Sequence, residues 1–365
     1  MILCSNPSEQ FKSYQSEIEQ AVLSVMRSNS YILGEQVNLL EKEFAEFIGT
    51  SSAIGVANGT DAIEISLKAL NIGHGDEVIT VSHTAVATVA AIEATGAKAV
   101  LVDIEKQFYT LNPVYLQQAL SKNTKAVVVV HLYGNAADLE SVQAFCRSNK
   151  LYLIEDTSQA HGAKYKGKRL GSIGDIGCFS CYPTKNLGAI GDAGLVTTND
   201  PDLANKIRMI REYGWKERVS ILPGRNSRLD EIQASILRIK LKHLDSDNQK
   251  RRKIASFYKD HLSHLPILLP NTRPNVEPVF HLFVIEVERQ KMLLDFLKKE
   301  GIQAGVHYSL PVHLHPAYLS KIAKLKDMSV TEMITKKIIS LPIYPELSNH
   351  NALSIVNSMK KFYNQ

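Results

Sequence analysis

Short apolar runs alternate with amphipathic stretches through the first half of the chain. The runs are rich in Val, Ile and Leu, which is typical of strands buried on both faces, and the stretches between them repeat apolar positions at helical spacing. The runs predict strands at 52–57, 77–81, 98–102, 126–130, 151–154 and 194–198, and the stretches predict helices at 61–70, 85–95, 113–121, 138–148 and 201–212. Because buried strands joined by crossover helices form parallel sheets, the pattern predicts an α/β fold with a mainly parallel sheet.

Helical patterns flank this alternating region on both sides. They predict helices at 11–28 and 37–48 before it, and a long helical run from about 226 to 244 after it. The composition then shifts at 245–252, and the pattern becomes shorter and mixed. It predicts helices at 248–264, 290–300, 330–338 and 350–362, with strands at 279–287 and 302–306. We therefore expect a large domain, residues 1–245, and a smaller C-terminal α/β domain, residues 246–365.

The composition is that of an ordinary globular protein. Of the 365 residues, 44% are hydrophobic and 22% are charged, and the net charge of +5 is spread along the chain. The densest basic run, 250–253, has no interleaved aromatic residues, which favours a solvated helix face over a nucleic-acid site. The N-terminus lacks the pattern of a signal peptide, and four cysteines are too few for a disulfide scaffold. These features predict a cytoplasmic protein without a membrane span.

Two groups of residues raise the question of a metal site. Cys178 and Cys181 form a C-x-x-C pair, but no second pair and no nearby His accompany them. We expect both thiols to pack as small apolar groups beside a strand. His307, His313 and His315 lack a carboxylate spaced to complete a metal site, and they lie in a Pro-containing loop that more often lines a cleft. We therefore expect no metal.

Candidate chemistry gathers where the predicted strands end. In a parallel sheet, ligands bind beyond the carboxyl ends of the strands. The turn 58–60 lies at such an end and opens a helix, where free N–H groups suit a phosphate, although Thr60 or Asp61 as a simple helix cap is the alternative. The loop that contains His83 follows the predicted strand 77–81, and Asp156 follows the predicted strand 151–154.

Asp156 and Lys185 are the two charged residues of most interest. Asp156 follows an apolar strand, so its carboxylate needs a cationic partner or a helix to cap. Lys185 follows an apolar and aromatic run and precedes Gly188, which leaves either a structural ion pair or a desolvated, nucleophilic amine. The 29 residues between the two leave room for a loop and one or two strands, so both could lie at one sheet edge.

Two glycine-rich stretches do not predict a nicotinamide site. Residues 171–177 and 188–194 have the spacing G-x-x-G-x-x-G, and neither lies between a first strand and a helix with an acidic residue downstream. The dinucleotide fingerprint requires G-x-G-x-x-G in that position.

In order and jointly, four motifs make the chain resemble the DegT/StrS-type sugar aminotransferases over nearly its whole length. The motifs are Asn58-Gly59-Thr60-Asp61-Ala62, Glu155-Asp156-Thr157-Ser158-Gln159-Ala160-His161-Gly162, the segment 179–188 and the segment 226–234. These enzymes use pyridoxal phosphate (PLP) and have the aspartate-aminotransferase fold. The resemblance thus implies the PLP-dependent transferase fold of type I.

The resemblance also implies a role for each motif residue. Lys185 would form the Schiff base with PLP and then act as base and acid, and Asp156 would keep the pyridine nitrogen protonated. Other residues would bind the cofactor: Gln159 its ring hydroxyl, Gly59, Thr60 and Ser180 its phosphate, and Asn226 the same phosphate from a partner subunit. The active unit would therefore be a homodimer. A branch of the family with His in place of Lys185 performs dehydration, so Lys185 favours transamination.

The chain departs from the family at two positions. An aromatic residue that stacks on the cofactor ring is replaced by Ala85, and we expect His83 to stack there instead, with a polar role for its imidazole as the alternative. The Phe that precedes the Tyr-Pro-Thr-Lys segment is replaced by Cys181, which alters packing and leaves the proposed chemistry unchanged.

Segments 83–88 and 211–216 resemble the subgroup that aminates C3 of dTDP-linked 3-keto-6-deoxyhexoses. The product would be a dTDP-3-amino-3,6-dideoxyhexose for a surface glycan or an antibiotic, with L-glutamate as amino donor. We expect Tyr182, Tyr213, His307 and Tyr308 to bind the substrate. One alternative is amination at C4 of a 4-keto sugar. The other is a non-catalytic regulatory protein that binds a nucleotide sugar, against which the full set of Lys185, Asp156 and Gln159 argues.

Overall fold

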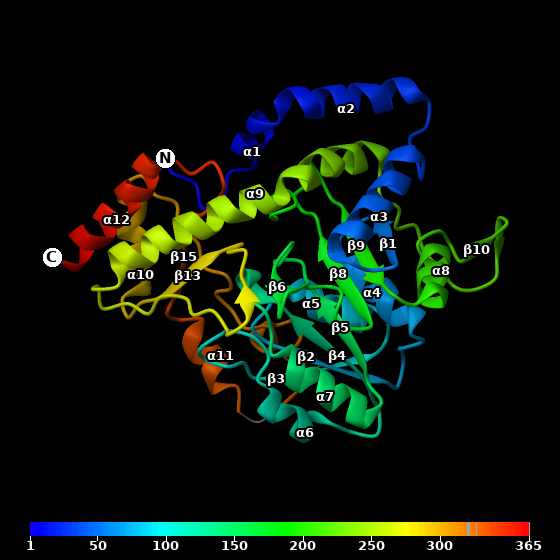
Figure 1. The fold of residues 1–365 in the computed structure, drawn as a ribbon. Helices are drawn as coiled ribbons and strands as arrows, with labels where there is room; N and C mark the ends of the chain where they lie inside the picture. Colours follow the sequence, from blue (N-terminus) through cyan, green and yellow to red (C-terminus); the bar gives the residue numbers. More distant parts are fainter. Residues whose placement is uncertain (320–321, 326, 365) are drawn as a thin grey trace.

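An eight-stranded sheet forms the centre of the molecule in the computed structural model, which describes residues 1–319, 322–325 and 327–364 (Figure 1). Its order is β1-β9-β8-β5-β4-β2-β3-β14. The strands are β1 (Ser52–Val56), β2 (Glu77–Val81), β3 (Lys98–Val102), β4 (Thr124–Val130), β5 (Tyr152–Asp156), β8 (Ile176–Ser180), β9 (Gly194–Thr198) and β14 (Ala323–Lys324). Neighbours from β8 to β14 are parallel, and only β9 runs antiparallel to its neighbours β1 and β8. The mainly parallel sheet is confirmed.

Both faces of this sheet are buried, which explains its continuous apolar strands. Along β4, Ala126 and Val128 pack into one hydrophobic cluster, and Val127 and Val129 pack into another on the opposite face. Side chains alternate between the faces of a strand, so a run without polar positions needs cover on both sides. The covering helices are α4 (Gly59–Ala69), α5 (Val86–Ala94), α6 (Leu116–Ala119), α7 (Leu139–Asn149) and α8 (Pro201–Ile210).

The remaining elements form the N-terminal helices, the C-terminal part and small hairpins. The helices α1 (Pro7–Ser13), α2 (Gln15–Ser28) and α3 (Glu35–Ile48) precede the sheet. The C-terminal part contains β13 (Phe283–Glu286), α10 (Gln290–Lys299), α11 (Ser329–Ile334), β15 (Ile338–Leu341) and α12 (Asn349–Tyr363). The small strands are β6 (Lys164–Tyr165), β7 (Lys168–Arg169), β10 (Trp215–Lys216), β11 (Val219–Ser220) and β12 (Val276–Glu277), and short 3-10 turns span Pro113–Tyr115, Leu132–Gly134 and Val312–Leu314.

One long helix joins the two parts of the chain. Helix α9 runs unbroken from Glu231 to Leu262, so the two helices predicted at 226–244 and 248–264 are one, and the predicted domain boundary falls inside it. Its first half packs in a cluster with α3 and β9, and its second half packs with β13, β15 and α12. Figure 1 shows this helix crossing the molecule above the sheet.

Other predicted elements differ in their details. The helix expected at 11–28 is divided at Tyr14 into α1 and α2, and that expected at 113–121 is a 3-10 turn followed by one helical turn. Residues 302–306 form isolated bridges through Ile302 and Gly305 in place of a strand. The stretch 330–338 ends as a helix at Ile334 and begins β15 at Ile338. Within the described residues, no helix is both long and apolar enough to cross a membrane.

Candidate active site

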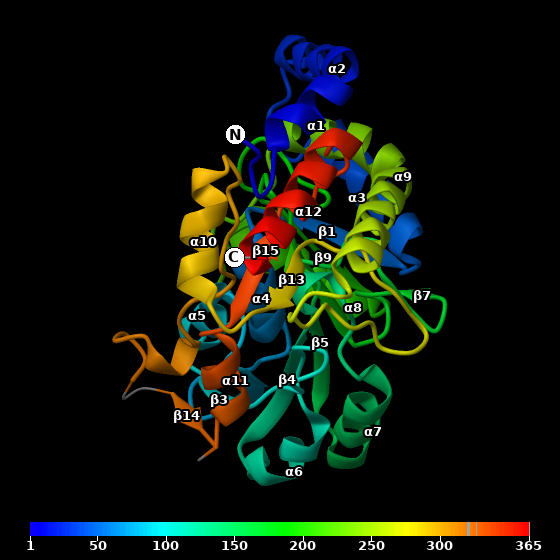
Figure 2. The same cartoon turned by 90° about the vertical axis from the view of Figure 1, so that its left-hand side faces the viewer.

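A cavity of about 700 Å³ opens where the parallel strands end and the C-terminal part meets them. The turns after the strands contribute Gly59, Thr60, Thr84, Ala85, Asp156, Gln159, Ser180, Tyr182 and Lys185 to its wall, and the C-terminal part contributes His281, Leu282, His307 and Tyr308. Figure 2 shows the C-terminal helices α10 and α12 and the sheet from the side of the C-terminal part. The predicted residues from separate strand ends therefore meet in one cavity.

Lys185 and Asp156 lie in the wall of this cavity. Burial lowers the pKa of the Lys185 amine, and the charge of Asp156 opposes that shift only in part. A lysine with a lowered pKa supplies more of the unprotonated amine that attacks carbonyl carbons. The expectation that the two residues meet at one edge of the sheet is confirmed by their place in one cavity.

The imidazoles near Lys185 are held neutral. Burial, followed by the charge of Lys185, lowers the pKa of His281 well below its ordinary value and lowers that of His307. His281 and His307 both line the cavity. The cavity thus presents neutral rings beside an amine, and Asp156 is the nearby group that carries charge of opposite sign.

Asp156 is fixed by two hydrogen bonds to its carboxylate. Thr88 Oγ1 donates to Oδ2 at 2.8 Å, and the backbone N–H of Ser158 donates to Oδ1 at 3.2 Å. Carboxylates held by such donors keep one orientation. Asp156 can therefore present its charge to a cationic or protonated group in the cavity.

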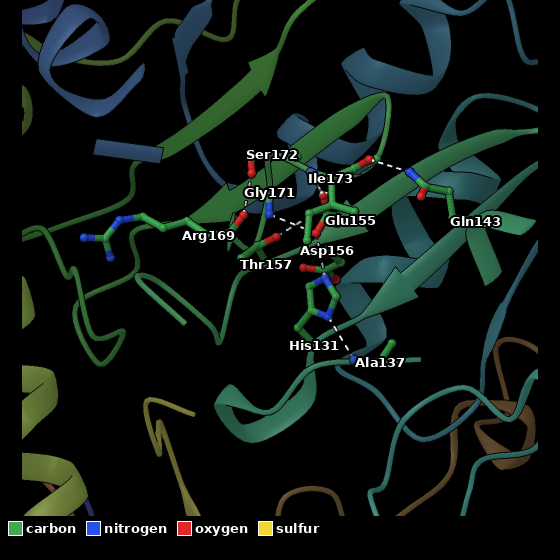
Figure 3. A network of polar contacts seen from close by, with 12 residues as sticks. His131, Ala137, Gln143, Glu155, Asp156, Thr157, Arg169, Gly171, Ser172 and Ile173 are labelled. Carbon is green, nitrogen blue, oxygen red and sulfur yellow. Dashed lines mark hydrogen bonds and ion pairs between the residues drawn. The ribbon is translucent and has the colours of Figure 1, made fainter. Parts of the chain in front are cut away.

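The neighbouring Glu155 anchors the end of the same strand (Figure 3). Its buried carboxylate accepts hydrogen bonds from the N–H groups of Gly171, Ile173 and Gly174 and from His131 Nε2 at 3.0 Å. Because His131 Nδ1 accepts the N–H of Ala137, its Nε2 carries the proton. Burial alone would raise the pKa of Glu155, and these donors lower it below its usual value instead. The network holds the backbone that carries Asp156.

The start of α4 forms a cradle that admits only glycine. A Cβ atom on Gly59 would lie 2.4 Å from Ser180 Cβ, closer than two such atoms can approach. Asn58 is the helix cap, since its Oδ1 accepts the N–H of Asp61 at 2.8 Å, so neither Thr60 nor Asp61 serves as the cap. The helix N-terminus with Gly59, Thr60 and Ser180 in the cavity wall suits an anionic group.

His83 does not occupy the position expected of it. The ring is 1% exposed and lies outside the cavity wall, where Thr84 and Ala85 stand instead. Its Nε2 pairs with Tyr133 Oη at 2.7 Å, and burial lowers its pKa to about 4. The expectation of a stacking imidazole is therefore wrong, and the polar role that we weighed against it is the one in the structure.

The other predicted residues divide between the cavity and the surface. Gln159, Tyr182, His307 and Tyr308 line the cavity, and Gln159 Nε2 donates to Tyr308 Oη at 2.9 Å. Tyr213 is 38% exposed and Asn226 is exposed, and neither lines the cavity of its own chain. Both belong to the segment around the β10–β11 hairpin, which projects from the body in Figure 1.

Sequence reasoning missed Thr88 and His281. Thr88 lies one helical turn after Thr84, and this spacing was the available signal for a second hydroxyl facing the strand end. His281 lies two residues before β13 and within the strand predicted at 279–287, where a polar residue in an apolar run was the signal.

The two cysteines of the C-x-x-C pair behave as packing residues. Cys178 and Cys181 are fully buried, and burial raises the pKa of Cys181 to about 12, so its thiol stays protonated. In the part of the chain that the structure describes, no group of three or more His, Cys, Asp or Glu side chains is arranged to hold a metal ion.

The geometry fits PLP. An amine with a lowered pKa, a fixed carboxylate and an anion cradle lie around one cavity. An amine suits the aldehyde of this cofactor, a carboxylate suits its ring nitrogen, and an anion cradle suits its phosphate. Chain similarity agrees with this fit. The chain is 43% identical over 350 residues to a dTDP-3-amino-3,6-dideoxy-alpha-D-galactopyranose transaminase of Aneurinibacillus thermoaerophilus, with 96% of each chain covered.

Two solved structures share the whole fold. DesV of Streptomyces venezuelae, in complex with a ketimine intermediate, has a TM-score of 0.97 and 39% identity, and the match covers 100% of this chain and 99% of that one. NtdA of Bacillus subtilis, with bound cofactor PMP, has a TM-score of 0.89 and 29% identity, covering 97% and 82% of the two chains. Residues 12–360 match the family as a whole. The protein is a member of the DegT/DnrJ/EryC1/StrS aminotransferase family.

Proposed function

We propose that the protein transfers an amino group from L-glutamate to C3 of a dTDP-linked 3-keto-6-deoxyhexose. The ketone oxygen of the sugar is replaced by an amine, and glutamate becomes its 2-keto acid. The observation that carries this proposal is the buried amine of Lys185 beside the fixed carboxylate of Asp156 in one cavity. The C3 position is supported by the name of the A. thermoaerophilus relative and by the resemblance of segments 83–88 and 211–216.

PLP, when bound, supplies a ring that accepts the electron pair released when a proton leaves the carbon beside the amine. The residues of this chain do the rest. Asp156 would stabilise the protonated ring nitrogen, Gly59, Thr60 and Ser180 would hold the phosphate, and Gln159 would bind the ring hydroxyl. Burial lowers the pKa of Lys185, so its Nζ would hold the proton that leaves the carbon beside the amine and would then give it back.

We also propose that the active unit is a homodimer in which each active site contains residues of both subunits. We propose that this dimer works in the cytoplasm. Phe11, Ile18, Val22 and Leu23 of α1 and α2 face Ile190, Ile232 and Ile236 across an apolar groove. Leu23 is 45% exposed, Ile190 50% and Ile232 37% in the single chain, which is an apolar surface that a second copy would cover. The exposed Asn226 would then reach the phosphate site of the partner.

The first experiment is an absorbance spectrum of the purified protein with PLP. The wild type should show a visible band that bleaches on addition of L-glutamate, and Lys185→Ala should show neither that band nor turnover. Turnover by Lys185→Ala would refute the role of Lys185. A protein that binds the nucleotide sugar but stays inert with PLP and glutamate would instead be the regulatory alternative.

The position of amination is tested with dTDP-4-keto-6-deoxyglucose, with and without a 3,4-ketoisomerase. Product should form only when the isomerase supplies the 3-keto sugar. Turnover without the isomerase would mean amination at C4.

Shared sites are tested by mixing two inactive variants. If Asn226 serves the site of the partner subunit, a dimer of one Lys185→Ala chain and one Asn226→Ala chain has one site with both defects and one site with neither. Random pairing should restore about a quarter of wild-type activity. A mixture as inactive as its components would exclude a site shared in this way.

A further inference from the structure

Tyr133 is a buried residue that contacts the cavity wall on both sides without lining the cavity. It lies in the 3-10 turn after β4. Its N–H donates to Gln159 Oε1 at 2.8 Å, and its hydroxyl contacts His83 Nε2 and the carbonyl of His307. Tyr133 thus joins residues of the large sheet to the segment that carries His307 and Tyr308.

The direction of these hydrogen bonds follows from the chemistry of the atoms. The His307 carbonyl can only accept, so the Tyr133 hydroxyl gives its single proton to that oxygen. Tyr133 Oη must then accept from His83, whose Nε2 therefore carries the proton. The buried Nδ1 of His83 has no partner in the part of the chain that the structure describes. One directed chain runs from His83 through Tyr133 to His307.

The same logic orients Gln159. Its Oε1 accepts from Tyr133, so its amide NH₂ group is the donor to Tyr308 Oη at 2.9 Å. Tyr308 therefore keeps its own hydroxyl proton for a partner in the cavity. The backbone of Tyr133 fixes which way the amide of Gln159 points.

The turn that holds Tyr133 also receives the other residues of the C-terminal wall. Leu282 N–H donates to Tyr133 O at 3.4 Å, and Val279 N–H donates to Gly134 O at 3.0 Å. A Cβ on Gly134 would lie 2.9 Å from the backbone N of His281, so the two segments are in direct backbone contact. The cavity residues His281, Leu282, His307 and Tyr308 thus all reach the large sheet at this turn or through Gln159.

The backbone of Tyr133 is itself unusual. Its φ of 61° and ψ of 6° lie in the left-handed region, which a bulky residue seldom adopts. Such a conformation persists only where surrounding contacts hold it, and it is common at functional sites. Here the hydrogen bonds of the N–H, carbonyl and hydroxyl groups supply those contacts.

We propose that Tyr133 is a positioning residue that aligns the C-terminal wall of the cavity, His307 and Tyr308 above all, with the cofactor side of the site. The proposal rests on the proposed function and on the expectation that His307 and Tyr308 bind its keto-sugar substrate. Asp156, the phosphate cradle and the backbone of Lys185 are held by other contacts, and the backbone N–H of Tyr133 holds Gln159. The hydroxyl of Tyr133 therefore acts on sugar binding and leaves the cofactor side in place.

The test replaces one hydroxyl in each of two neighbouring tyrosines. Tyr133→Phe keeps the ring, which packs against Tyr109 with centroids 5.7 Å apart, and removes the bonds to His83 and His307. Tyr109→Phe is the matched control, because its buried hydroxyl bonds Glu286 and contacts neither His307 nor Gln159. We expect KM for the keto sugar to rise about tenfold in Tyr133→Phe, with kcat, PLP affinity and melting temperature close to those of Tyr109→Phe.

Hydrogen–deuterium exchange gives a readout that needs no substrate. In the PLP-bound protein, amides in a peptide covering 305–310 should exchange faster in Tyr133→Phe than in the wild type or Tyr109→Phe. If the exchange of that peptide does not change, or if KM matches that of the control, the proposal is overturned. A wild-type protein inactive on the keto sugar would refute the proposed substrate alone, and the exchange result would still decide the role of Tyr133.

Discussion

At the scale of single residues, Thr88 decides how the carboxylate of Asp156 is presented. Thr88 donates to Asp156 Oδ2 and accepts in turn from Thr84, at 3.1 Å between the two hydroxyls. Thr88→Val removes one of two hydrogen bonds that orient the carboxylate. We expect kcat to fall about tenfold with PLP still bound, as for the loss of a hydrogen bond to a charged group. Steady-state kinetics at saturating PLP measures this.

Thr84→Val is the control for that prediction. Thr84 reaches Asp156 only through Thr88, so its loss should reduce kcat by a smaller factor. Equal effects of the two variants would mean that the threonines act through packing and not through Asp156.

His161 makes the stability of the protein sensitive to acid. Both ring nitrogens are buried and have no hydrogen-bond partner among the described residues, and burial lowers the pKa of the ring to about 3. Between pH 6.5 and that value the unfolded chain binds a proton that the native protein does not, so stability is lost as the pH falls. This residue should contribute a slope of about 1.4 kcal/mol per pH unit to the free energy of unfolding.

Urea unfolding of His161→Leu between pH 4.5 and 6.5 checks the slope. In the variant, the slope of the unfolding free energy against pH should be smaller by the amount that one bound proton contributes. The exposed His350 is the control, since its ring meets water in both states and His350→Leu should keep the wild-type slope. An unchanged slope in His161→Leu would show that His161 does not stay neutral in the native protein.

The sequence indicates the charged residues of the cavity better than the contacts of neutral ones. Lys185 and Asp156 were predictable because a charge at the end of an apolar strand needs a special reason to be there. The position of His83 was not, because its ring orientation depends on Tyr133, 50 residues further along the chain. The spacing of Thr88 from Thr84 marks a shared face, but the partner of the Thr88 hydroxyl is known only once β5 places Asp156 beside it.

At the scale of elements, the start of α3 depends on a residue of another helix. The cap position of α3 is Gly34, which has no side chain to cap it. Glu231, 2% exposed at the start of α9, accepts the N–H groups of Gly34, Gln36 and Val37 at 2.8–2.9 Å. One carboxylate thus satisfies three amides that α3 leaves unpaired.

Glu231→Gln replaces one of the two accepting carboxylate oxygens by an NH₂ group, which cannot accept a hydrogen bond. We expect it to destabilise the protein by about 2 kcal/mol, because a buried amide loses its partner. Glu35→Gln, an exposed change in the first turn of the same helix, should cost less than about 0.5 kcal/mol. Urea unfolding midpoints of the two variants measure the difference, and similar midpoints would contradict the capping role.

Element prediction worked where burial alone decides the structure. The strands at 77–81 and 98–102 were predicted with the bounds they have, because both faces of each are covered. Residues 302–306 look like a strand but have partners only at isolated bridges, since pairing depends on distant residues that a local pattern does not describe. The N-terminal helices were joined in the prediction because Tyr14 does not interrupt the helical spacing.

At the scale of the whole molecule, the charged stretch at 245–252 was taken as a boundary and lies in the middle of α9. Asp245 and Ser246 are exposed there, while Asp247, Asn248 and Arg251 are buried in the same helix. Asn248 bonds Asn186 and the carbonyl of His161, so this part of α9 contacts the segments that follow Lys185 and Asp156. A shift in composition shows only that a stretch is polar. Here the polar side chains make contacts between the two parts of the chain, so the shift does not mark a linker.

The continuity of α9 should therefore couple the two parts. Ser246→Pro removes a helical hydrogen bond and clashes with the preceding turn at an exposed position midway along the helix. We expect a loss of about 3 kcal/mol in the free energy of unfolding and two resolved calorimetric transitions, one for each hydrophobic cluster that α9 joins. Ser246→Ala, which favours the helix, should melt in one transition close to the wild type. A proline variant that also melts in a single transition near the wild-type temperature would mean that contacts around the cavity, and not α9, hold the two parts together.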